Sequence, residues 1–306
     1  MTNNTQNLML RDVSYDIVKS LEARPMNLMK FGTSFMGNNN GSIIEVKVNA
    51  GTANRPSIYS PGQTPTNLST QYEKRYTPVV AFDANEYVSK QQLSHSTPSS
   101  LYNILKSGSK KFSTEQDLYT VSSLVGNVNV VGINGVSTST SLPSANYIAD
   151  GGLTLDSEKV LEMIGVTVDN NWDYQDSWVA FCDAKTLTRF QNDDKINGDY
   201  LGQKRIEELQ NTKGITGIMG MVYANINFVT VPPIFLPAPT KGAPKDVTTI
   251  LFFNSAGFQY IEYPFQIEEK KGNNVFDVEY QYGIEAGVIR THENSVFVFE
   301  VLKEPA

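Results

Sequence analysis

The sequence predicts an α+β fold, and three observations support this prediction. Strand-like stretches at Ile43–Val48 and Gln71–Phe82 enclose an excursion at Asn49–Thr70 that is rich in Gly, Pro, Asn, Ser and Thr. Apolar residues at helical spacing follow over Ser99–Val125. Four more strand-like stretches close the chain after residue 246.

The excursion and its flanking strands are the most informative feature of the chain. Ile44, Val46 and Val48 fall on one face of the first strand, and polar residues fall on the other. A structureless loop of such length is uncommon in a compact domain and is usually disordered or in contact with a partner. An isolated two-stranded hairpin is marginal in water. We therefore expect an arm that lies on a neighbour, and the obvious neighbour is another copy of this chain.

The first half of the chain contains two helical patterns and a loop. Residues 8–31 are weakly helical, with a stop at Pro25. The stretch 99–125 predicts a long helix that Gly108 could break. Residues 127–152 are rich in Gly, Ser, Thr and Asn and predict a surface loop.

A capped helix and a buried strand come next. Thr154 or Asp156 is expected to cap a helix that ends at Gly165. Its predicted apolar face consists of Leu155, Val160, Leu161, Met163 and Ile164. Residues 177–182 predict a short buried strand, and Asp183 can cap the helical turn that follows it.

The last third is mostly strand. A helix is expected at 200–211 and one half-exposed strand at 221–230, followed by a proline-rich loop at 231–244. The four closing strands are predicted at Val247–Phe253, Tyr260–Glu268, Val275–Ile289 and Ser295–Leu302.

Composition limits the function. The chain has 306 residues, with 25 basic against 32 acidic residues and a net charge of −7, and it has no Lys/Arg-rich block, which argues against a protein that grips nucleic acid. Cys182 is the sole cysteine, so we expect no intrachain disulfide and a reducing compartment. No signal peptide and no membrane helix are apparent, so a soluble cytosolic protein is expected.

Residues that could carry chemistry are few. His95 and His292 stand in separate elements without metal-ligand spacing. Asp193–Gly198 imitates a calcium loop, but Lys195 stands where an oxygen ligand is needed. Cys182 lies in an apolar run and is expected to be an inert buried thiol. We therefore expect no catalytic, cofactor-binding or metal-binding residues and a protein that is not an enzyme.

In its order of elements, the chain resembles the major capsid protein of tailed bacteriophages, which has the HK97-type fold. Residues 43–82 match the projecting loop that lies across a neighbouring subunit. Residues 178–231, with WVAFCDAKTLTRF and then GITGIMGMVYANINFVTV, are similar to the passage through the axial domain. VEYQYGIEAGVIRTHENSVFVFEV, at 278–301, resembles the closing strands.

The resemblance implies an HK97-like fold with four parts. These are an amino-terminal arm at 1–40, an extended hairpin loop (E-loop) at 41–82, a peripheral domain with a long spine helix and long strands at 83–177 that 262–306 completes, and an axial domain at 178–261. Since only 42 residues precede the hairpin, a separate scaffold protein or none is expected.

The implied function is structural. Hexamers and pentamers of the chain would form an icosahedral shell around double-stranded DNA, assembled in the bacterial host cytoplasm. The implied partners are further copies of the chain, scaffolding, portal and cement proteins, and packaged DNA by proximity, with no membrane and no cofactor. Candidate intersubunit contacts in the extended loop are Arg55, Tyr59, Gln63, Tyr72, Lys74, Arg75 and Tyr76.

Two alternatives stay open at this point. The Tyr, Asn, Ser and Thr content suits a phage tail or surface-recognition protein that binds carbohydrate. A hydrolase is the third reading, because a nucleophile, its base and the group that orients the base need only be adjacent in space.

Overall fold

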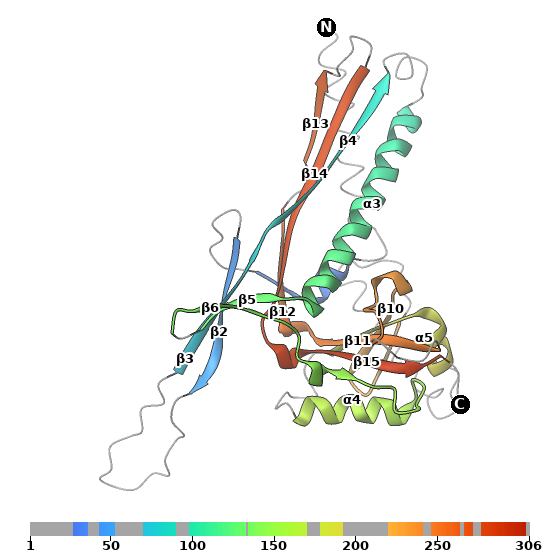
Figure 1. Cartoon of the computed structure of the whole chain (residues 1–306). Helices are drawn as coiled ribbons and strands as arrows, with labels where there is room; N and C mark the ends of the chain where they lie inside the picture. The colour runs from blue at the N-terminus through green and yellow to red at the C-terminus, as the bar shows by residue number, and fades with distance from the viewer. Residues whose placement is uncertain are drawn as a thin grey trace.

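The protein has an α+β fold, as predicted, in a computed structural model (Figure 1). The structure describes residues 27–35, 43–52, 70–89, 98–132, 134–169, 178–191, 220–240, 246–263, 266–271 and 277–303. Residues 8–26 of the helical pattern expected at 8–31, the helix expected at 200–211, the calcium-like segment and His95 lie outside these ranges. In the described part, the strands form sheets of five, six and four strands.

The five-stranded sheet is long and narrow. Its strands are β1 (Thr33–Ser34), β12 (Phe258–Glu262), β14 (Asp277–Arg290), β13 (Gln266–Lys271) and β4 (Val80–Ser89). β14 is the central strand, with β4 on one side and β12 followed by β13 on the other. The predicted strand 260–268 is therefore two strands, β12 and β13, which continue one another along the same neighbour.

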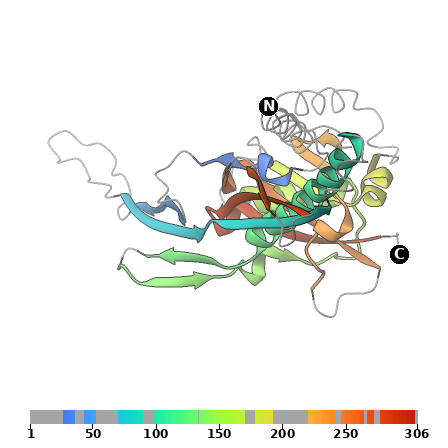
Figure 2. The same ribbon diagram turned by 90° about the horizontal axis from the view of Figure 1, so that it is seen from above.

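Helix α3 (Pro98–Val125) covers one face of this sheet (Figures 1 and 2). The ring of Phe112 packs edge-on against Tyr282 at 5.3 Å, and Tyr119 packs against Phe82 at 5.7 Å. The predicted helix is confirmed, but the predicted break is not, because 28 residues run through Gly108 as one helix. An interior glycine costs only about 1 kcal/mol relative to alanine, which packing of the helix can offset.

The six-stranded sheet forms a second layer below the long sheet in Figure 1. Its order is β7 (Tyr147–Ile148), β15 (Val296–Leu302), β11 (Val247–Asn254), β8 (Trp178–Cys182), β10 (Ile226–Thr230) and β9 (Gly220–Tyr223). Every residue of β8 and β11 is buried, because both faces of the sheet are covered. The predicted part boundaries assign β7 and β15 to the peripheral domain, whereas strand pairing places both in this sheet.

Helices α4 (Ser157–Asp169) and α5 (Ala184–Gln191) cover one face of the six-stranded sheet. As predicted, carboxylates cap both helices: Asp156 accepts from the Lys159 amide at 2.9 Å, and Asp183 accepts from the Thr186 amide at 2.9 Å. The predicted end of α4 at Gly165 is wrong, since the helix continues for another turn. Leu161, predicted on the apolar face, is 67% exposed.

Two further predictions were wrong for a shared reason. The single strand expected at 221–230 is the hairpin of β9 and β10, which turns at Ala224 and Asn225 with φ of 48° and 63°. Positive φ at both central residues is what a tight hairpin turn requires. The loop expected at 127–152 contains β7 and two more strands, β5 (Val128–Val131) and β6 (Ser137–Thr140). In both places the local composition did not indicate the strands that form, because these strands are stabilised by pairing with other segments.

The four-stranded sheet has the order β2 (Ile43–Thr52), β3 (Thr70–Pro78), β5 and β6. The predicted hairpin is confirmed, and its pairing extends to Thr52 opposite Thr70, past a bulge between Asn49 and Gly51. The stretch predicted as one strand at 71–82 divides at Val79, because β3 stays in this sheet while β4 joins the long one.

Candidate assembly arm and its anchor

The β2–β3 hairpin points away from the rest of the molecule (Figure 1). The sequence predicted an arm that lies on a neighbouring copy because an isolated hairpin is marginal, but this hairpin is not isolated. β5 pairs with β3 through residues 74–76, so the base of the hairpin lies in a larger sheet. Ile44 and Val46 also pack on a small apolar cluster with Val130 and Ile289. The chain therefore supports the base of the hairpin by itself.

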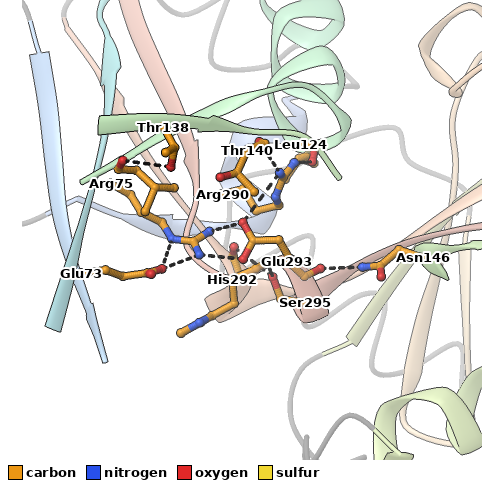
Figure 3. A network of polar contacts seen from close by, with 12 residues as sticks. Glu73, Arg75, Leu124, Thr138, Thr140, Asn146, Arg290, His292, Glu293 and Ser295 are labelled. Carbon is orange, nitrogen blue, oxygen red and sulfur yellow. Dashed lines mark hydrogen bonds and ion pairs between the residues drawn. The ribbon is translucent and has the colours of Figure 1, made fainter. Parts of the chain in front are cut away.

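Arg75 is the polar centre of this base (Figure 3). Its guanidinium donates two parallel hydrogen bonds to Glu293, at 2.7 Å and 2.6 Å, and a third from Nε to Glu73 at 2.8 Å. The side chain of Arg75 is 5% exposed. Glu293 belongs to the short turn between β14 and β15, so this paired contact joins the hairpin to the corner of two other sheets.

Arg290 extends the network to the end of α3. Its guanidinium donates to the carbonyl oxygens of Leu124, Gly126 and Thr140, and the residue is fully buried. Unpaired carbonyls at a helix C-terminus carry partial negative charge, which a cation neutralises. Glu293 lies 4.0 Å from Arg290, so one carboxylate stands between the two arginines.

Asn146 fixes the turn that carries Glu293. Its amide donates to the backbone carbonyls of Glu293 at 2.7 Å and Val296 at 2.8 Å. The hairpin, the spine of the long sheet, helix α3 and the edge of the six-stranded sheet thus meet at one cluster. We call Glu73, Arg75, Arg290 and Glu293 the anchor.

The charges of the anchor shift the pKa of its members. Burial alone would raise the pKa of Glu293, but hydrogen bonds and charge from Arg75 hold this pKa below its usual value. Burial lowers the pKa of Arg290, and the charge of Arg75 lowers it further. Burial and the same arginine lower the pKa of His292, although Glu293 and Glu73 oppose the change. The anchor therefore favours an ionised Glu293 and a neutral His292.

The predicted contact residues fall into two groups. Tyr72 is 59% exposed, Lys74 pairs at the surface with Glu45 at 2.9 Å, and the Tyr76 hydroxyl lies 2.7 Å from the Ser137 hydroxyl. These three side chains lie on the outer face of the hairpin. Arg75 instead points inward and is held by its own chain. The remaining candidates, Arg55, Tyr59 and Gln63, lie outside the described residues.

Sequence reasoning missed Glu293 and Arg290. The signal was present, because two charged residues interrupt the apolar pattern between the last two strands. A charge in such a position is either exposed in a turn or paired in the interior, and sequence alone does not separate these cases.

Residues considered for chemistry have other roles. Cys182 is fully buried, and burial raises the pKa of its thiol, with a smaller contribution from Asp183. Among the described residues, no group of three or more His, Cys, Asp or Glu side chains could hold a metal ion. None of the helices described is both long enough and apolar enough to cross a membrane.

No family model and no curated protein matches the sequence. The structure, however, is similar to solved structures over nearly its whole length. It matches the capsid of Ralstonia phage GP4 with a TM-score of 0.65 and 9% identity, covering 94% of this chain and 92% of that chain. It matches the capsid of cyanophage P-SCSP1u with a TM-score of 0.57 and 13% identity, covering 91% of this chain and 88% of that chain. It also matches a virus-like particle from Pyrococcus furiosus with a TM-score of 0.51 and 8% identity, covering 93% of this chain and 96% of that chain. The chain thus has the HK97-like capsid fold that its element order predicted.

Proposed function

We propose that this chain is the major capsid protein of a tailed double-stranded DNA bacteriophage. Copies of it assemble as hexamers and pentamers into an icosahedral shell that encloses the genome. The observation that carries the proposal is the match to capsid structures over about nine tenths of the chain. The protein is accordingly structural and not an enzyme.

The architecture suits this role. A shell needs one chain to make many heterologous contacts, which close only under a symmetry operator. β2–β3 provides an arm for such contacts, and the anchor fixes the direction of this arm with a buried ion-pair network. The balance of 25 basic against 32 acidic residues also suits an inner wall that does not hold DNA firmly.

The parts of the fold take the following assignments within the proposal. Residues 41–82 are the extended loop, α3 is the spine helix, and the long sheet is the core of the peripheral domain. The six-stranded sheet is the axial domain, which then takes in β7, α4 and β15 as well as 178–257, because β12 belongs to the long sheet. Residues 1–40 are the amino-terminal arm, and scaffolding, portal and cement proteins are the other partners.

Imaging of the purified protein tests the proposal. We expect closed particles by electron microscopy and native mass measurement, either from the chain alone or from the chain coexpressed with its scaffold protein. A strict monomer at high concentration with scaffold present would contradict the proposal. A trimer with affinity for glycans would favour the surface-recognition alternative instead.

A further inference from the structure

The face of the long sheet opposite α3 carries a hollow that the proposed function does not yet use. In β14, residues of even number from Val278 to Ile284 are buried toward the helix, so Gly283 and Glu285 point to the other face. Gly283 pairs with Asp83 of β4 and with Gln266 of β13. Gly283 has no side chain, and the hollow around it has a volume of about 640 Å³, although a Cβ atom at Gly283 itself would lie 3.1 Å from the Phe82 carbonyl oxygen of the neighbouring strand.

The hollow is acidic. Asp83 and Glu285 are both exposed and lie on adjacent strands as diagonal neighbours, with Asp83 opposite Gly283 and Glu285 opposite Ala81. Diagonal neighbours on one face of a sheet are about 7 Å apart, so the two carboxylates repel each other. Neither carboxylate forms an ion pair with any of the described residues. Glu268 also lines the hollow, and none of its described lining residues is a lysine or an arginine.

The outer face of the hairpin has the opposite charge. Lys47 of β2 and Lys74 of β3 stand directly opposite each other and are both exposed. Like charges in this arrangement destabilise a strand pair. Glu45 pairs with Lys74, while Lys47 has no ion pair among the residues that the structure describes. The hairpin thus presents two close lysines, and the hollow presents two close carboxylates.

These two surfaces cannot satisfy each other within one molecule. The hairpin and the long sheet leave the anchor in different directions (Figure 1). From this geometry we infer that the hollow around Gly283 receives Lys47 and Lys74 of a second copy, with the lysine stems in the hollow and the ammonium groups on Asp83 and Glu285. This contact rests on the proposed function, and it names the pair of surfaces that joins neighbouring copies.

Charge exchange tests the inference. We expect the double change Asp83→Lys with Glu285→Lys, and separately Lys47→Glu with Lys74→Glu, to raise the protein concentration needed for assembly at least tenfold. All four changes together should restore assembly to within threefold of wild type. A control with Glu115→Lys and Glu158→Lys makes the same change in net charge as the Asp83/Glu285 variant, at exposed helix positions, and should assemble normally. Circular dichroism verifies that each variant folds. Normal assembly of either double variant, or no recovery in the fourfold variant, overturns the inference.

Disulfide trapping provides a test that does not require a closed shell. Chains with Lys47→Cys are mixed with chains carrying Asp83→Cys and oxidised; the native Cys182 is buried and should not react. A covalent dimer that needs both variants is expected, and mixtures of Lys47→Cys with Glu115→Cys should give none. If wild type forms no shell but the dimer appears, the contact stands and the proposed function fails. If shells form but no dimer appears, the contact is wrong.

Discussion

Lys74 and Arg75 are adjacent cations on β3 with different environments. Because successive side chains of a strand point to opposite faces, Lys74 faces solvent while Arg75 enters the anchor. Exposed ion pairs stabilise a fold weakly, whereas removal of one partner from a buried pair leaves an uncompensated charge. Loss of the positive charge at these two neighbouring positions therefore has different consequences for stability.

We predict that Arg75→Met lowers the free energy of unfolding by about 3 kcal/mol, since Glu73 and Glu293 would lose their shared cation in a largely buried site. Lys74→Met is the matched control, and its exposed ion pair predicts a loss of less than about 1 kcal/mol. Urea unfolding followed by circular dichroism measures both. Equal losses would contradict the assignment of Arg75 to the anchor.

His292 provides a pH dependence with a definite sign. Burial and Arg75 lower its pKa in the folded protein, so the unfolded chain takes up a proton at a higher pH than the folded chain does. The stabilisation that comes from a neutral His292 should be fully present above about pH 6.5. The free energy of unfolding should fall as the pH decreases below that value. The measurement is the thermal unfolding midpoint between pH 7.5 and 5.5.

His292→Gln should flatten this profile over the same pH window. The chain has one other histidine, so His95→Gln is the control and should keep the wild-type profile. A profile unchanged in the His292 variant would show that another group causes the pH dependence.

Among the elements, glycine positions show where packing is tight and where it is open. In α4, a Cβ atom at Gly165 would meet nothing within 4 Å. At Gly32, which follows the 3-10 helix at Leu28–Phe31, a Cβ atom would overlap the buried ring of Phe258. The first glycine is therefore replaceable and the second is required by the core.

We expect Gly165→Ala to raise the free energy of unfolding by about 0.5–1 kcal/mol, because alanine favours the helix and the site is open. Gly32→Ala should instead lower it by about 1–3 kcal/mol, the usual cost of overpacking. Denaturant titration of the two single variants checks both signs. A loss of stability in the Gly165 variant would mean that the exposed face of α4 is already in contact with another molecule.

At the scale of the whole molecule, the hairpin is supported at its base and projects beyond it. Because β5 and the anchor hold this base, the monomer should not need the segment beyond Thr52 and Thr70 in order to fold. Within the proposed function, that segment serves contacts between copies.

Replacement of residues 53–69 by an Asn-Gly turn should leave a folded monomer and abolish closed particles. The folded state is measured by thermal unfolding and the particles by electron microscopy. A control chain with a Gly/Ser linker of the same length separates the role of the side chains from that of loop length. Normal particles from the shortened chain would show that residues 53–69 are not needed for assembly.

The sequence by itself determined the elements whose pattern is local. The helical spacing at 98–125, the apolar runs of β8 and β11 and the alternation along β14 each report burial of a single segment, and they were predicted correctly. The hairpin was also predicted, because two alternating strands flank turn residues. Layout alone was enough to indicate the capsid fold.

Only the tertiary structure decided which partner each segment meets. Arg75 pairs with a glutamate 218 residues away, and β5 became a strand through β3 although its composition resembles a loop. The hollow at Gly283 likewise arises where β4, which is distant in sequence, lies beside the paired strands β13 and β14. Local periodicity encodes how deeply a segment is buried, whereas pairing depends on contacts between distant segments, which no window of the sequence contains.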